Sequence, residues 1–149
     1  MSTPVQHCYG NDFSHCYGCG KNNPAGLHIE THWNGQEGQA VFTPRPEHIA
    51  VPGFVYGGLL ASLVDCHGVG TAAASVSVPG QSVPRYVTAS LHVDFLRPTP
   101  LGPELTLRAW VKEQRGRKVV ITVEISALGS VRVRGEVVAV PMPETMGVE

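Results

Sequence analysis

The feature that most restricts the fold of this chain is a set of four alternating segments in its second half. Apolar and polar residues alternate in 87–96, 105–112, 119–127 and 131–139. A period of two predicts strands with one apolar face. Turn signals separate the segments: PTPLGP at 98–103, RGR at 115–117 and GS at 129–130. We therefore predict an antiparallel meander with one covered face.

One long apolar segment precedes these strands. Residues 57–76, GGLLASLVDCHGVGTAAASV, contain no proline and predict a helix that is buried on most sides. Glycine costs about 1 kcal/mol relative to alanine inside a helix. We expect Gly58, Gly68 and Gly70 to be tolerated because a surrounding sheet packs too closely for larger side chains.

The chain before the helix divides into two parts. Residues 1–26 are rich in Cys, His, Gly, Asn and Tyr, and we interpret them as an irregular lead-in segment. Two short strands follow, LHIETHW at 27–33 and QAVF, because Asn34-Gly35 is a strong hairpin signal. A hairpin, a buried helix and a long antiparallel sheet predict an α+β fold in which the sheet curls around one helix. The folded domain is expected at 27–141, with a tail at 142–149.

Length and charge exclude several classes of protein. The 149 residues suit one domain, and a net charge of -1 gives no extended surface for nucleic acid or an anionic membrane. Only 15% of the residues are charged, which suggests that some surface is covered by another subunit. The first residues do not resemble a signal peptide, and no run of about 18 apolar residues predicts a membrane span. We expect a cytoplasmic protein with free thiols.

Asp65 is the most informative polar residue. It is the only Asp, Glu, Lys or Arg between His48 and Arg85, and it lies in the middle of the apolar helix. A carboxylate in such a segment either faces solvent or a subunit boundary, or serves as a catalytic base whose pKa is raised by burial. His67 is two residues away and points to a different helix face, so a direct Asp-His pair is not expected.

Gly57 and Gly58 stand where the helix is predicted to begin. The first amides of a helix have no partner within it, and its dipole favours negative charge there. Glycine also lets a substrate oxygen approach closely. Combined with an acid two turns further on, this start is a candidate oxyanion site. The motifs of serine hydrolases, zincins and P-loop enzymes are absent from the sequence.

Two other clusters carry possible chemistry. Cys16 and Cys19 have the spacing of metal ligands, and Cys8 or His15 would complete a tetrahedral zinc site; the alternative is an ordered turn with buried thiols. A basic cluster surrounds the predicted turn at 115–117. It contains Lys112, Arg115, Arg117 and Lys118. It is either a solvated turn or a binding site for phosphate groups.

Three segments together resemble a known family. CYGCGKNNPAGL, PGFVYGGLLASLVD and VTASLHVDFLRPTPLG look like the hotdog-fold acyl-CoA thioesterases of the phenylacetyl-CoA thioesterase-like group, and the likeness covers about residues 16–140. The resemblance implies a helix wrapped by an antiparallel sheet, a homodimer or homotetramer, and active sites at the dimer interface. It implies an acyl-CoA substrate and no separate cofactor, since coenzyme A is part of the substrate.

Residue roles follow by position from this resemblance. It implies Asp65 as general base or nucleophile, the amides of Gly57 and Gly58 as oxyanion donors, and Thr88 as the hydroxyl that positions water. Ser90 is expected beside Thr88 on the polar face of its strand. Candidates for substrate and phosphate contacts are Tyr56, Arg97, Arg115, Arg117 and Lys118. The sequence departs from the family at Tyr56, where a histidine is usual, and at Ala50, where some members carry a polar residue.

Other functions stay open at this point. Tyr56 in place of histidine also suits a non-catalytic protein that binds acyl-CoA. An enzyme of the same fold that adds or removes water at an enoyl thioester would need His67 or His92 as a catalytic partner, and neither is suitably placed. A zinc-dependent interaction module would be built on residues 7–19.

Overall fold

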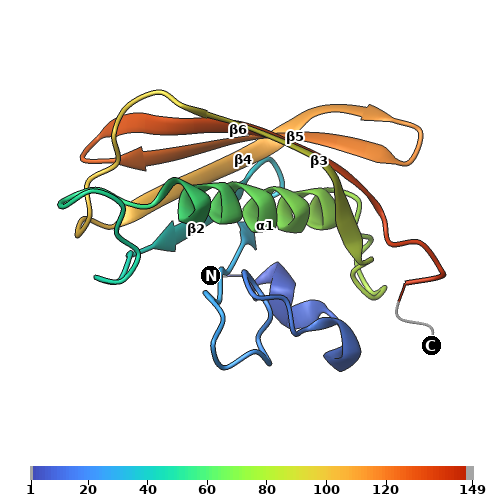
Figure 1. Cartoon of the computed structure of the whole chain (residues 1–149). Coiled ribbons are helices and arrows are strands. Elements are labelled where there is room, and N and C mark those ends of the chain that lie inside the picture. The colour runs from blue at the N-terminus through green and yellow to red at the C-terminus, as the bar shows by residue number, and fades with distance from the viewer. Residues whose placement is uncertain (1, 147–149) are drawn as a thin grey trace.

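The alternating segments and the apolar segment form one sheet and one helix in the computed structural model, which describes residues 2–146. Helix α1 spans Gly57–Ser75. The strands are β1 His32–Trp33, β2 Gly38–Phe42, β3 Tyr86–Phe95, β4 Leu105–Arg115, β5 Lys118–Ala127 and β6 Ser130–Pro141. They form one antiparallel sheet in the order β1-β2-β4-β5-β6-β3, which curls over α1 (Figure 1). The predicted α+β hotdog arrangement is confirmed.

The position of β3 differs from the predicted meander. Strands β4, β5 and β6 are consecutive neighbours, but β3 pairs with β6 rather than with β4. The segment 96–104 does not make a tight turn, because it is held near the start of the helix. There the amide of Val55 donates to the carbonyl of Thr99, and the amide of Leu101 donates to that of Gly53, each at 2.9 Å. Alternation predicted a strand, but it carries no information about the neighbour of that strand.

The first predicted strand is shorter than expected. Only His32–Trp33 of the range 27–33 joins the sheet. The preceding residues hydrogen-bond to the lead-in segment instead: the amide of Leu27 donates to the carbonyl of Tyr17 at 2.8 Å, and the amide of Ile29 donates to that of Gly18 at 3.1 Å. Alternating burial therefore persists through 27–31 without sheet pairing.

The predicted turn at Asn34-Gly35 is confirmed. β1 and β2 pair on either side of it, and Gly35 has a φ of +97°, a backbone conformation that favours glycine. The side chain of Asn34 accepts hydrogen bonds from the amides of Gln36 and Glu37. This Asx arrangement stabilises the turn.

Helix α1 packs directly on the sheet at Gly68, as predicted. The prediction is wrong for the other two glycines, because a Cβ at Gly58 would meet the ring of Tyr56 and a Cβ at Gly70 would meet Gln6 and Thr31. A Cβ built at Gly68 would lie 2.5 Å from a methyl group of Val137 on β6, and one built at Gly135 would lie 2.5 Å from a methyl group of Val64. The facing sheet residues are fully buried: Leu105, Leu107, Ala109, Val119, Ile121, Val123, Ile125, Val133, Val137 and Ala139. Contact at this distance requires a hydrogen atom in place of a side chain on one of the two surfaces.

The lead-in segment lies against the side of α1 that faces away from the sheet (Figure 1). It contains only two 3-10 turns, Val5–Cys8 and Asn11–Phe13, within residues 2–26. Its Gln6 side chain donates to the hydroxyl of Thr31 at 3.0 Å, and that hydroxyl lies 2.9 Å from Nδ1 of His67. These contacts join the segment to the helix.

The C-terminal end of the described chain runs beside β3. The amide of Met142 donates to the carbonyl of Arg85 at 2.9 Å, which holds the start of the predicted tail beside β3. Residues 147–149 of that tail lie outside the described residues. Within 2–146, no helix has the length and apolar character needed to cross a bilayer.

Candidate active site

Asp65 and Thr88 meet at one point between the helix and the edge strand. The hydroxyl of Thr88 donates a hydrogen bond of 2.5 Å to Oδ1 of Asp65. Asp65 is half-buried in the third turn of α1, and Thr88 lies near the start of β3. The structure therefore brings together two residues that are separated by 23 positions and that were predicted to act in one site.

A β-bulge orients Thr88 toward the helix. Thr88 pairs with Ala139 of β6, but Ser90 pairs with Val138, so Ala89 is an extra residue in β3. Directly paired residues share a sheet face, and Ala139 is fully buried on the helix side. Simple alternation placed Thr88 and Ser90 together on the polar face, and this placement is wrong because the bulge puts them on opposite faces.

Burial affects the pKa of the Asp65 carboxyl. Desolvation raises the pKa of this carboxyl above its ordinary value, and the hydrogen bond from Thr88 opposes the rise. Asp65 and Thr88 line a pocket of about 200 Å³ together with Arg85 and the thiols of the lead-in segment. A carboxylate with a raised pKa at the edge of a pocket is a stronger proton acceptor than an exposed one.

The helix start forms a second part of the candidate site. The first amides of a helix, here those of Gly57 and Gly58, have no partner inside the helix. No side chain at the N-cap position accepts a hydrogen bond from them either. The ring of Tyr56 lies against Gly58 so closely that a side chain at Gly58 would overlap it. Asp65 follows Gly57 by eight residues, or about 12 Å along the helix axis. Within one chain, the Asp65 carboxylate and these amides are therefore too far apart to act on the same carbonyl group of a substrate.

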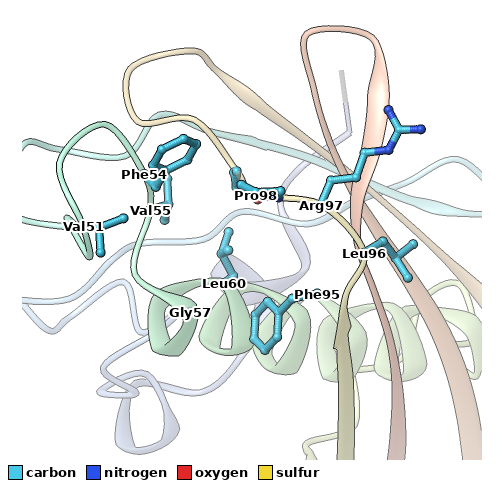
Figure 2. Close-up of a pocket in the computed structure, with 10 residues that line it drawn as sticks. Val51, Phe54, Val55, Gly57, Leu60, Phe95, Leu96, Arg97 and Pro98 are labelled. Carbon is cyan, nitrogen blue, oxygen red and sulfur yellow. The ribbon is translucent and has the colours of Figure 1, made fainter.

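An apolar cavity of about 450 Å³ opens beside this helix start. Figure 2 shows Leu60 of α1 between the loop that carries Phe54 and Val55 and the end of β3 at Phe95. Phe54 and Phe95 are exposed despite their size. The cavity can accept an apolar group next to the amide of Gly57. Sequence reasoning missed these lining residues, since they come together only through the position of β3.

The basic candidates lie at two ends of the sheet. Arg97 borders the apolar cavity, and its guanidinium points away from the helix start (Figure 2). The other three candidates, Arg115, Arg117 and Lys118, lie around the β4–β5 hairpin and line a different pocket of about 620 Å³. This hairpin is at the same end of the sheet as Thr88, because Ala139 pairs with both Thr88 and Val119.

The predicted zinc ligands separate into two groups. Cys16 and Cys19 lie together, but Cys8 is exposed and its thiol donates to the carbonyl of Pro4. His15 is also exposed and does not lie with Cys16 and Cys19. The third member is Cys66 of α1, which the sequence did not single out. Neither Cys8 nor His15 therefore completes a site with Cys16 and Cys19.

The two histidines considered for other chemistry are not at the Asp65 pocket. His67 is fully buried; its Nε2 lies 3.1 Å from the carbonyl oxygen of Gly38, and burial lowers its pKa to about 4. Its neutral ring connects the helix to β2. His92 is exposed on β3 and contacts Asp94 at 3.1 Å. Neither position suits a partner of Asp65, as the sequence indicated.

Comparison with known proteins identifies the family. The sequence model of the thioesterase superfamily matches residues 52–138, which is more than half of the chain. The chain belongs to the thioesterase superfamily. A solved structure described as a thioesterase superfamily protein from Shewanella loihica PV-4 is 46% identical, covers 91% of this chain and 100% of its own, and superposes with a TM-score of 0.71.

Two further relatives extend this thioesterase comparison. The E. coli PaaI protein from the phenylacetic acid degradation operon shares the fold, with a TM-score of 0.66 at 20% identity over 78% of this chain and 81% of its own. The acyl-coenzyme A thioesterase THEM4 of Xenopus laevis is 34% identical over 57% of this chain. The match spans 35% of the length of this curated relative.

Proposed function

We propose that this thioesterase-superfamily protein hydrolyses an acyl-CoA thioester to a free acid and coenzyme A. The observation that carries the proposal is the half-buried carboxylate of Asp65, held by Thr88 at the edge of a pocket. The family and the THEM4 relative support a thioester substrate. Asp65 is the proposed catalytic residue, and Thr88 is a positioning residue.

The proposed reaction uses water as the nucleophile. The Asp65 carboxylate takes a proton from water as the oxygen of that water bonds to the thioester carbonyl carbon. The carbonyl oxygen becomes negatively charged, and amides at a helix start stabilise it. The intermediate then collapses, the carbon–sulfur bond breaks, and the coenzyme A sulfur leaves and takes up the proton. Direct attack by Asp65 to form an anhydride is the alternative. If water then attacks the Asp65 carbonyl carbon of the anhydride, a single turnover in water labelled with heavy oxygen places the label on Asp65 and leaves the acid unlabelled, whereas direct hydrolysis labels the acid.

The acid and the amides must come from two copies of the chain. The separation of about 12 Å along α1 prevents one Gly57 amide and one Asp65 from sharing a carbonyl within a subunit. Strand β3 lies at the end of the sheet order, and Leu91 and Phe95 are 40% and 55% exposed on it. We infer a homodimer, or a homotetramer of such dimers, in which β3 lies at the subunit boundary.

The substrate has two chemically different ends. In the proposal, the apolar cavity beside Gly57 receives the acyl group, supported by its lining of Val51, Phe54, Leu60 and Phe95. The guanidinium and ammonium groups of Arg97, Arg115, Arg117 and Lys118 are proposed contacts for the phosphates of coenzyme A.

All four cysteines are free of disulfide bonds, which supports the proposal of a cytoplasmic location, where thiols stay reduced.

A panel of acyl-CoA thioesters with the wild-type protein tests this function. We expect thioester absorbance to fall faster than in buffer for at least one acyl class. Thioester absorbance is preferable to a thiol dye, because the exposed thiol of Cys8 reacts with the dye as well. Acyl-CoA binding in calorimetry without hydrolysis would instead establish the non-catalytic binder that Tyr56 in place of histidine suggests.

Replacing Thr88 tests its positioning role. Thr88→Val keeps the shape but removes the hydrogen bond to Asp65, and a bond to a charged group contributes about 1.5–3 kcal/mol. We expect kcat to fall roughly 10- to 100-fold while KM changes little. Thr88→Ser restores the hydroxyl and should recover most of kcat. Equal activity of the valine variant and the wild type would remove Thr88 from the account.

A further inference from the structure

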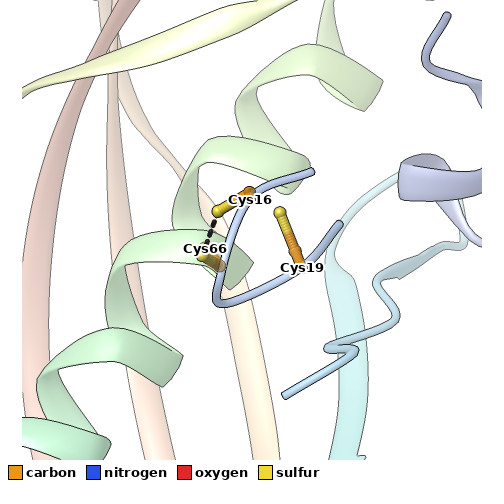
Figure 3. A group of neighbouring side chains, drawn as sticks. All are labelled: Cys16, Cys19 and Cys66. Atoms are coloured by element: carbon orange, nitrogen blue, oxygen red, sulfur yellow. Dashed lines mark hydrogen bonds between the residues drawn. The ribbon is translucent and has the colours of Figure 1, made fainter. Parts of the chain in front are cut away.

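Three thiols beside the proposed active site take no part in the proposed hydrolysis. Cys16 and Cys19 lie on the lead-in segment, and Cys66 lies on α1, adjacent in sequence to Asp65. Their sulfur atoms all lie within 4.8 Å of one another, and the Cys16 and Cys66 sulfurs are 3.8 Å apart (Figure 3). Two segments separated by about 50 residues thus direct their thiols at one point.

The spacing of these sulfurs suits a tetrahedral metal ion. Zinc binds thiolate sulfur at about 2.3 Å, so two sulfurs in a tetrahedral site are separated by about 3.8 Å. The Cys16–Cys66 distance equals this separation. A disulfide would use two of the thiols and leave the third unpaired, whereas one metal ion engages all three.

One turn of the lead-in segment carries both Cys16 and Cys19 and places their thiols beside Cys66 of α1 (Figure 3). The thiolate is the form that binds metal, so an ion bound here would displace the thiol protons.

Glycines allow this turn to reach the helix. A Cβ at Gly18 would overlap the sulfur of Cys66, and a Cβ at Gly20 would overlap the backbone at Cys16. The amide of Gly20 donates to the carbonyl of Cys16 at 2.8 Å, which closes the turn. The loop geometry therefore serves to bring the two loop thiols against Cys66.

We propose that Cys16, Cys19 and Cys66 bind one zinc ion that joins the lead-in segment to helix α1. A pocket of about 200 Å³ borders all three cysteines, and a water molecule from this pocket is the proposed fourth ligand. This ligand set replaces the one expected from the sequence, because Cys66 takes the place of Cys8 and His15. The site is independent of the proposed hydrolysis, since neither its ligands nor its geometry require an acyl-CoA.

Metal analysis of the untagged full chain, purified without chelators, tests the site. We expect about one zinc per chain in the wild type and in the exposed-thiol control Cys8→Ser. Cys19→Ser and Cys66→Ser should each lose most of it. Zinc far below one per chain after growth with added zinc overturns the proposal, as does full zinc content in both cluster variants.

Cobalt substitution provides a readout that needs no variant to fold. Adding Co²⁺ to zinc-depleted wild type should produce intense sulfur-to-cobalt charge-transfer bands and the visible spectrum of tetrahedral cobalt, and added zinc should displace both. A weak spectrum typical of octahedral cobalt contradicts the site. A disulfide between any two of these cysteines in the freshly purified protein, detected by mass spectrometry of the intact chain, also contradicts it. Acyl-CoA hydrolysis is not part of either readout, so the two proposals fail separately.

Discussion

Gly68→Val is expected to lower the free energy of unfolding by about 3 kcal/mol, the upper end of the usual cost of overpacking a core. Even a Cβ at position 68 would lie 2.5 Å from one methyl group of Val137 and 3.4 Å from one of Val123. Both neighbours are fully buried in the sheet and cannot move into solvent. The helix must therefore separate from two strands to admit the new side chain. Urea unfolding, followed by circular dichroism, measures this loss.

A pair of smaller changes tests the same contact more selectively. Val137→Ala leaves a cavity and Gly68→Ala adds a methyl group at the same place, so each alone should destabilise the protein. The double variant should be more stable than the sum of the two losses predicts, because the new methyl group fills the space that the valine left. Additive losses would mean that helix and sheet are less closely packed than the structure indicates.

The covered sheet and the buried helix were predictable because each has a period that local sequence reveals. Alternation in β5 placed Val119, Ile121 and Val123 on one face, and all three are fully buried. The helix was predicted at 57–76 and ends one residue earlier, at Ser75. Of its three predicted contacts between glycine and sheet, the one at Gly68 is confirmed by the closeness of Val137.

Pairing and side-chain direction at the site were not predictable in the same way. The neighbour of β3 depends on how the segment 96–104 binds the loop before the helix, which is a long-range contact. The extra residue Ala89 reverses the alternation between Thr88 and Ser90, and no local signal marks it. Asp65 was identified because an isolated charge in an apolar helix is conspicuous without any structure.

Cys66 shows a different limit of sequence reasoning. It is 47 residues from Cys19, so spacing alone did not connect it to the Cys-x-x-Cys turn. The available signal was a cysteine directly after the predicted catalytic acid. The lead-in segment was expected to be irregular. Its position against one side of the helix depends on long-range contacts such as that between Gln6 and Thr31.

Asp65→Asn is expected to lower kcat for thioester hydrolysis by about 10²- to 10⁴-fold, the usual contribution of a general base. Asparagine has the same shape, and its side-chain oxygen can still accept the hydrogen bond from Thr88, so the fold and the pocket should persist. The variant loses only the negative charge and the ability to take a proton from water. Binding of the acyl-CoA should therefore change far less than turnover.

The most direct test of the central claim is kcat for one acyl-CoA, measured side by side for wild type, Asp65→Asn and Asp12→Asn. Asp12 is an exposed carboxylate in the lead-in segment that does not line the Asp65 pocket, and it provides the matched control. The account predicts that the Asp12 variant matches the wild type and that the Asp65 variant loses at least about 100-fold. Hydrolysis by a folded Asp65→Asn protein at the wild-type rate would contradict it.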